Sequence, residues 1–278
     1  MTSVDALTFD DLTPDDMEAV LNLSGEAGWT QVADDWRLMM GLGYCAGFRD
    51  PSGVPIASGV ALPMDDRHGW ISMILVTKQW QRKGLATKLV DKCCDWLEER
   101  GITPLLDATP AGRTVYSQMG FHDLLGISRW RREDGVSGGE TIASPARAEA
   151  LTWIADYDAK VFGAHRPSIL GDLMTRGPAF VVDHEAGFLL GREGRGVTQL
   201  GPVSANDEAA AKSLLDTAIA SISGTITIDA FDAQEGFASH LTACGFTVQR
   251  GFTRMIRGPV RTMGDPVLAY AAAGPELG

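Results

Sequence analysis

A short basic segment stands out in a chain that is acidic overall. The chain has 278 residues and a formal net charge of −12 at pH 7, yet residues 78–92 contain one acidic residue, Asp91, against five basic ones. The basic residues are Lys78, Arg82, Lys83, Lys88 and Lys92. Concentrated positive charge of this kind can attract an anionic ligand such as a phosphate. A solvated basic turn is the alternative interpretation when charge alone is considered.

The backbone expected around Gly84 also suits an anion. The sequence from about Gly84 to Arg100 is amphipathic at helical spacing, which predicts a helix that begins inside the basic segment. The first N–H groups of a helix have no partner within the helix, and its dipole favours negative charge at that end. Glycine allows close approach of the backbone. We therefore predict a phosphate or pyrophosphate site at residues 81–86.

Similar sequence features appear twice along the chain, in the same order. Three features recur at a separation of 125 to 131 residues: predicted helix starts at Thr13-Pro14 and Ser144-Pro145, strand-like runs at 70–76 and 197–203, and Gly-Phe pairs at 120–121 and 245–246. Residues 135–139 are rich in glycine and favour a linker. We predict two copies of one α+β unit, 1–135 and 144–278, joined by a linker at 136–143.

The segment Gln81-Arg82-Lys83-Gly84-Leu85-Ala86 resembles the Q/R-x-x-G-x-G/A signature of the GCN5-related N-acetyltransferase (GNAT) superfamily. Asp107-Ala108-Thr109-Pro110 and Tyr116-x-x-x-Gly120-Phe121 follow at the family's usual distance. Phe162-Gly163-Ala164-His165-Arg166 resembles the FGA-x-R element of the second domain in tandem acetyltransferases. The resemblance implies two tandem GNAT-like domains of the α+β class. Each is expected to be an α/β/α sandwich with a mixed, mostly antiparallel twisted sheet and helices on both faces.

The resemblance also implies a cofactor site, with acetyl-CoA as co-substrate. Backbone groups of Ile74 and Val76 would pair with the pantetheine arm, and six backbone N–H groups would hold the pyrophosphate: those of Arg82, Lys83, Gly84, Leu85, Ala86 and Thr87. Ala86 stands where the family more often has glycine. Tyr116 falls on the position of the general acid that protonates the departing CoA thiolate. The alternative for Tyr116 is a core aromatic beside the Gly120-Phe121 turn.

The acceptor is expected to be a small-molecule amine. Residues 1–36 contain nine acidic residues and no basic ones, so a negative wall would attract a cation. Glu26, Trp29 and Asp107 are the candidate substrate contacts, with Trp36 as a second apolar surface for an ammonium group. Glu26 and Asp107 could instead be a surface acid and a turn cap. The general base stays unassigned among Glu26, Asp107, His68 and a water molecule relayed through Ser72.

The second copy is expected to be degenerate. Its loop at 203–212 lacks glycine and places Asp207-Glu208 where the phosphate would bind, and Leu241 replaces Tyr116. Two carboxylates at a helix N-terminus repel a pyrophosphate, so one CoA site per chain is predicted. Arg166 could contact a substrate anion, but an arginine after a helix more often binds backbone carbonyls. The apolar closing segment, 271–278, is expected to pack against the protein.

Several functional classes are disfavoured. The four cysteines (Cys45, Cys93, Cys94 and Cys244) lack metal-ligand spacing, so no metal is predicted. The acidic charge argues against nucleic-acid binding, and no apolar run approaches the roughly 20 residues of a membrane span. With no signal peptide apparent at Met1, we expect a cytoplasmic monomer or homodimer. The predicted function is N-acetylation of a small-molecule amine; the alternatives are an acyl-CoA sensor and a protein-lysine acetyltransferase.

Overall fold

The chain folds into two compact units, residues 1–106 and 107–278, here called the first and second unit. The computed structural model describes residues 3–133, 143–259 and 263–278. This division differs from the predicted boundary at 135 because strand β6 (Phe121–Arg132) pairs along its length with β12 (Thr247–Arg257) and also with β11 (Ile226–Phe231). The predicted linker lies outside the described residues, except for Ala143.

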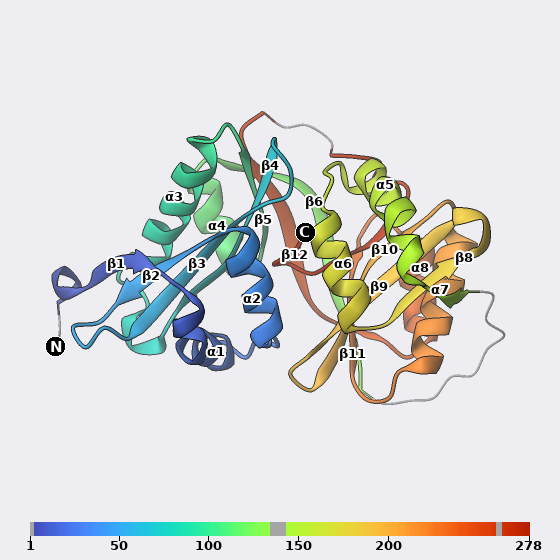
Figure 1. The fold of residues 1–278 in the computed structure, drawn as a ribbon, viewed down its shortest axis with the longest axis horizontal. Helices are drawn as coiled ribbons and strands as arrows, with labels where there is room; N and C mark the ends of the chain where they lie inside the picture. The colour runs from blue at the N-terminus through green and yellow to red at the C-terminus, as the bar shows by residue number, and fades with distance from the viewer. Residues whose placement is uncertain (1–2, 134–142, 260–262) are drawn as a thin grey trace. The chain divides into compact units, whose positions relative to one another are not determined.

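The first unit is a mixed sheet with helices on both faces (Figure 1). Its strands are β1 (Thr8–Asp11), β2 (Tyr44–Arg49), β3 (Pro55–Pro63), β4 (His68–Val76) and β5 (Thr103–Ala108). Consecutive strands pair antiparallel, except that β4 and β5 are parallel. The helices are α1 (Met17–Glu26), α2 (Ala33–Leu42) and α3 (Leu85–Glu98). The short turn η3 (Lys78–Trp80) leads from β4 toward α3.

A bulge in β4 divides its side chains between the two faces of this sheet. The β3–β4 register shifts between the pairs Ser58↔Leu75 and Val60↔Ser72, and Met73 there has a left-handed φ of +52°. An extra residue reverses the side-chain alternation. Ile74 therefore lies on the α3 side, while Ser72 contacts Met39 of α2 on the opposite side.

The second unit has the same plan. Strands β8 (Ala179–Val182), β9 (Gly187–Gly194) and β10 (Val197–Ala205) pair antiparallel, whereas β10 and β11 are parallel. The short β7 (Ser144–Pro145) extends the edge at β8, and β13 (Ala269–Ala272) lies between β10 and β11. The helices are α4 (Pro110–Gln118), α5 (Leu151–Phe162), α6 (Pro167–Arg176), α7 (Glu208–Ser221) and α8 (Glu235–Ala243). The predicted α+β class is confirmed.

Buried ion pairs fix the closing segment of the second unit. Arg166 donates from Nε and Nη2 to the Asp158 carboxylate at 2.8 and 3.0 Å. Its Nη1 donates to the main-chain oxygens of Leu277 and Gly278 at 2.6 and 2.8 Å. Arg166 thus binds backbone carbonyls, as is more common for an arginine after a helix, and the closing segment packs as expected, with Leu277 fully buried.

Removal of the Arg166 side chain should strongly destabilise the second unit. Arg166→Ala leaves the Asp158 carboxylate buried without a counter-charge, which costs about 3–5 kcal/mol. Urea unfolding followed by circular dichroism measures the change. The matched control is Arg37→Ala, because Arg37 pairs with Asp34 on the surface and such pairs contribute about 1 kcal/mol or less. Equal shifts for the two variants would contradict the assignment.

Candidate functional site

The N-terminus of α3 presents a row of backbone N–H groups without acceptors. Gly84 is the N-cap, with a left-handed φ of +80°, and Arg82 has a left-handed φ of +59°. A non-glycine residue in that conformation costs about 1–2 kcal/mol, so the turn is imposed by its surroundings. In the described part of the chain, no acceptor receives a hydrogen bond from the backbone N–H groups of residues 82–87. This is the geometry expected of an anion site.

Two side chains anchor the loop that precedes α3, residues 77–84, to the sheet and to α1. Gln81 donates from Nε2 to the carbonyl oxygen of Val76 at 3.1 Å, which ties the start of the loop to the end of β4. Glu26 accepts a hydrogen bond from the backbone N–H of Lys78 at 2.7 Å through Oε1. Trp80 is buried under the loop, and the Lys83 ammonium lies 4.4 Å from the centre of its ring. The loop is therefore held in place before any ligand binds.

The edge of β4 that faces β5 is open beyond its first three residues. The β4–β5 ladder covers His68 to Trp70 in the described residues. The N–H of Thr77 donates to the carbonyl oxygen of Ile56 in β3. Because the backbone N–H and C=O groups of successive residues in an extended strand point to opposite sides, those of Ile74 and Val76 point away from β3. They can pair with an extended ligand, as the resemblance implies. The carbonyl of Val76 already accepts from Gln81.

Tyr116 and Asp107 both lie in the second unit. The half-buried Tyr116 is on α4, and its ring centre is 6.0 Å from that of Phe121. Asp107 is buried and accepts from Nε and Nη2 of Arg254 at 2.9 Å each. Burial raises the pKa of the Asp107 carboxyl, and the neighbouring Arg254 charge opposes that shift. This bidentate pair gives Asp107 a structural contact that the sequence did not predict.

The remaining predicted acceptor residues differ in accessibility. Trp36 is fully buried, and its indole N–H donates to the Ser24 hydroxyl at 3.1 Å, so the expectation that it offers a surface to an ammonium group is wrong. Trp29 is half-buried just after α1. His68 Nδ1 lies 3.3 Å from the Asp65 carboxylate, and Ser72 is buried beside Met39.

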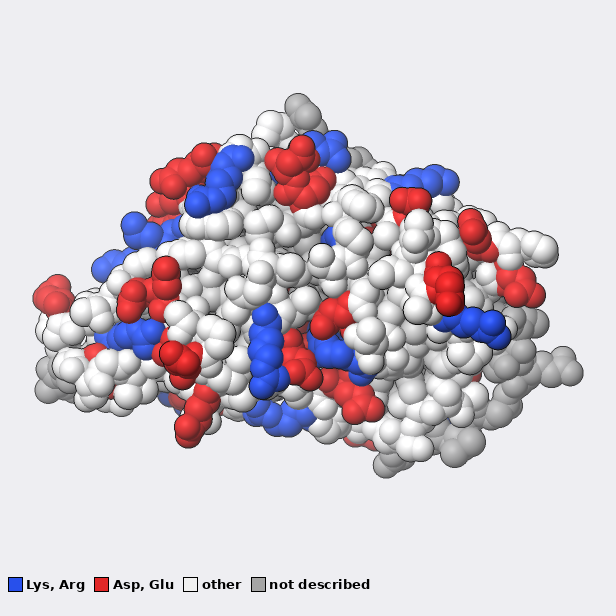
Figure 2. Space-filling model, viewed as in Figure 1, with Lys and Arg blue, Asp and Glu red and all other residues white. Residues whose placement is uncertain are grey.

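An acidic cavity of about 490 Å³ opens in the first unit. Asp15, Glu18 and Glu26 line it, together with the apolar Ile56. Asp16 also lines it but is paired with Arg49 at 2.7 Å. Carboxylates of α1 and of the short turn before it therefore line this cavity. On the face of the molecule drawn in Figure 2, acidic and basic side chains are interspersed.

The described residues of the second unit differ from the site around α3 in two respects. Asp207 caps α7, accepting from the N–H of Ala210 at 2.9 Å, so a carboxylate occupies the helix N-terminus as predicted. Strand β13 fills the gap between the parallel strands: Ala271 pairs with Val203 of β10 and with Ala230 of β11. Leu241, the counterpart of Tyr116, is fully buried. No local sequence signal predicted the insertion of β13.

Sequence spacing also missed a cluster of three polar side chains. His240 of α8 and Cys244, the C-cap residue of that helix, meet Asp216 of α7. His240 Nε2 lies 2.8 Å from the Asp216 carboxylate, and the Cys244 sulfur lies 3.6 Å from both groups. These contacts within the cluster account for its geometry. Asp216 lies far from Cys244 in sequence, so a search for short cysteine spacings cannot find it.

Comparison with known proteins decides the family. A model of the acetyltransferase (GNAT) family matches residues 11–121, and a model of an acetyltransferase (GNAT) domain matches residues 154–267. The chain belongs to the GNAT superfamily. It is a tandem-domain member, and this superfamily consists of acyltransferases that generally use acetyl-CoA. Among the described residues, no helix is long and apolar enough to span a membrane.

Relatives agree with this assignment. The chain is 31% identical over 107 residues to the uncharacterized N-acetyltransferase YitH of Bacillus subtilis (strain 168), a match that spans 38% of this chain and 37% of the relative. A putative acetyltransferase from Pyrococcus horikoshii has a TM-score of 0.86 at 19% identity, covering 100% of this chain and 98% of that one. A tandem GNAT protein from the clavulanic acid biosynthesis pathway has a TM-score of 0.66 at 14% identity, covering 92% and 100%. These structures show a shared fold.

Loss of the Glu26 carboxylate should loosen the loop that precedes α3. In Glu26→Ala the N–H of Lys78 loses its acceptor, and we expect its hydrogen exchange to accelerate about tenfold, the equivalent of about 1.4 kcal/mol. Mass-spectrometric hydrogen exchange of a peptide that begins several residues before Lys78, such as 73–84, provides the measurement.

Two variants serve as controls. Glu18→Ala removes an exposed carboxylate from the same helix and should leave the exchange unchanged. Glu26→Gln keeps an acceptor oxygen and should lie close to the wild type. If Glu18→Ala and Glu26→Ala behaved alike, the anchoring role of Glu26 would be refuted.

Proposed function

We propose that this protein transfers the acetyl group of acetyl-CoA to a primary amine of a small molecule. The observation that carries the proposal is the row of unpaired N–H groups at residues 82–87, which follows a strand whose outer edge is open. Acetyl-CoA supplies an activated thioester. The N–H groups of the loop bind its pyrophosphate, and the backbone of Ile74 and Val76 orients its pantetheine arm.

In the proposed transfer, the neutral amine attacks the thioester carbon directly. A C–N bond forms, the C–S bond breaks, and the Tyr116 hydroxyl gives its proton to the departing sulfur. General acid catalysis of this kind contributes about 10²–10⁴-fold. We assign no general base: the enzyme selects the amine that is already neutral, the proton released on attack passes to solvent, and the Tyr116 phenolate regains a proton from solvent.

The acceptor in this proposal is a small-molecule amine that is protonated, and therefore cationic, in solution before it loses a proton and reacts. Support comes from the acidic cavity of the first unit, where the carboxylates of Asp15, Glu18 and Glu26 raise the local concentration of cations. Glu26 also holds the backbone of Lys78, so it contributes to both the acidic wall and the loop. Trp29, three residues after Glu26 in the sequence, remains the apolar candidate contact.

Acetyl-CoA should bind at one site per chain, and a methyl group at position 84 should weaken it. Gly84→Ala places a Cβ in open space at the N-terminus of α3 with a strained φ, where it would obstruct the pyrophosphate. Isothermal titration calorimetry should show a stoichiometry of one and a Kd at least about tenfold higher in the variant, equivalent to about 1.4 kcal/mol.

Gly101→Ala is the matched control. Gly101 lies beyond the other end of α3, has a φ of +74° against +80°, and its Cβ would also meet no atom within 4 Å. Both variants carry the same backbone strain, so a Kd that rises equally in both would refute the loop as the pyrophosphate site. Two sites per chain would refute the degenerate second domain.

Tyr116→Phe should lower kcat by about 10²-fold or more while leaving the Kd of acetyl-CoA unchanged, because it removes a proton donor and keeps the ring. Release of the CoA thiol in the presence of a panel of small amines measures the rate. Tyr44→Phe is the control, since the Tyr44 ring stacks on Trp96 in the first unit and should retain full activity. Unchanged kcat in Tyr116→Phe would exclude the acid role. Binding of acetyl-CoA without turnover of any amine would favour the acyl-CoA sensor.

A further inference from the structure

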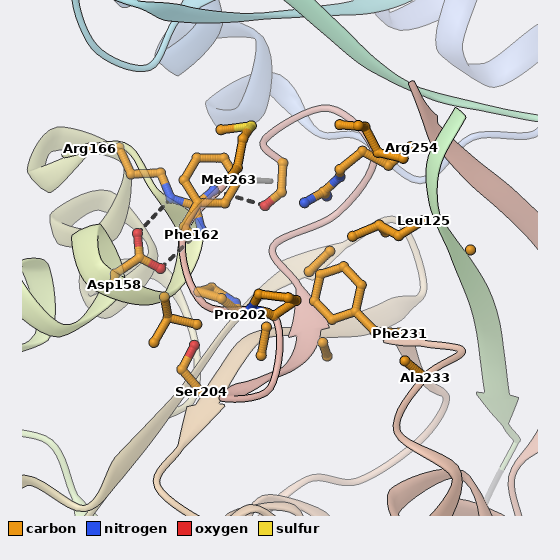
Figure 3. Close-up of a pocket in the computed structure, with 18 of the residues that line it drawn as sticks. Leu125, Asp158, Phe162, Arg166, Pro202, Ser204, Phe231, Ala233, Arg254 and Met263 are labelled. Carbon is orange, nitrogen blue, oxygen red and sulfur yellow. Dashed lines mark hydrogen bonds and ion pairs between the residues drawn. The ribbon is translucent and has the colours of Figure 1, made fainter. Parts of the chain in front are cut away.

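The second unit contains a cavity of about 400 Å³ that no step of the proposed reaction uses. Figure 3 shows its walls: Phe162 of α5, Pro202 and Ser204 of β10, Phe231 of β11 and Leu125 of β6. The backbone of β13 completes the wall at Ala269, Ala271 and Ala272. The volume lies within the range of small-molecule sites, which are mostly apolar with a few polar groups.

The charged groups around the cavity form ion pairs with one another or with neighbours. The pairs are Arg166 with Asp158, Arg254 with Asp107, and Asp123 with Arg113. A ligand ion in this cavity would lose its hydration without gaining an unpaired counter-charge, which is costly. The electrostatics therefore favour an uncharged ligand.

Aromatic rings and one hydroxyl group define what such a ligand would contact. The Arg166 guanidinium lies 3.6 Å from the centre of the Phe162 ring, and that of Arg254 lies 5.3 Å from the centre of the Phe231 ring. These contacts fix both rings at the cavity wall. Ser204 is buried, and its hydroxyl makes no hydrogen bond to any described residue. It offers one polar contact in apolar surroundings.

The position of β13 separates this cavity from cofactor chemistry within the second unit. The strand pairs with both β10 and β11, so the gap in which a pantetheine arm would lie is filled by the chain itself. A molecule in the cavity contacts β13 and has no acyl donor beside it in this unit. A ligand can therefore bind there without acyl transfer.

We propose that the second unit binds one uncharged, largely apolar small molecule, with an aromatic or branched body and a single hydrogen-bonding group that meets Ser204. This site is separate from the proposed cofactor site at α3. Its test uses no acetyl-CoA, so its failure would leave the proposed acetyl transfer unaffected.

The neutral fluorophore N-phenyl-1-naphthylamine tests the cavity directly. Titration of the full chain should give enhanced, blue-shifted emission that saturates at one probe per chain, with a Kd of about 10 µM or tighter. Leu125→Trp and Ser204→Leu each fill the cavity and should weaken binding at least about tenfold. Val248→Trp adds the same bulk at an exposed position on β12 and should bind as the wild type does. Thermal unfolding of each variant verifies that it is folded.

Competition tests the chemical class. Neutral 2-naphthol should displace the probe, whereas the 2-naphthoate anion and the 2-naphthylmethylammonium cation should be at least about tenfold weaker. Ser204→Ala should weaken 2-naphthol more than it weakens naphthalene. Equal competition by the charged compounds would overturn the assignment of an uncharged ligand. Probe binding that is absent in the wild type, or unaffected by both filling variants, would overturn the site.

Discussion

The structure depends on two parallel strands that pair for three residues and then separate. In the first unit the ladder joins β4 and β5 over His68 to Trp70, and in the second it joins β10 and β11 over Thr198 to Leu200. Beyond those residues the facing backbone groups need other partners, because buried N–H and C=O groups are costly to leave unpaired. The second unit satisfies them with β13. Among the described residues of the first unit, no strand pairs with that edge of β4 beyond Trp70, which is the physical basis of the proposed cofactor site.

The same contrast appears at the two helices that follow these strands. Gly84 opens α3 with N–H groups that have no acceptor, whereas Asp207 opens α7 with a carboxylate bound to the N–H of Ala210. An anion at α7 would meet like charge, and an extended ligand beside β10 would have to displace a strand. Either obstacle would weaken binding of the cofactor in the second unit, and the two obstacles arise from separate parts of the chain. The repeat thus preserves the fold while removing the features suited to the donor.

Local features were predictable from the sequence, and long-range contacts were not. The amphipathic pattern after Gly84 predicted a helix, which spans Leu85–Glu98, because helical periodicity and capping depend on neighbouring residues. The bulge at Met73 has no comparable signal, and the contact of Asp107 with Arg254 joins residues 147 positions apart. The burial of Trp36 was missed for the same reason: its partner, Ser24, is on another helix. Tertiary packing decides such contacts.

The cavity of the second unit keeps its volume because its walls are tied to different elements. Arg166 joins α5, through Asp158, to the closing turn at Leu277 and Gly278, and Arg254 joins β12 to Asp107. Protein interiors otherwise approach close packing, so large apolar side chains stay apart only where rigid contacts hold them. Buried ion pairs add little net stability compared with apolar packing, but they fix geometry. A cavity fixed in this way is already formed when a ligand arrives, and this reduces the ordering cost that binding must overcome.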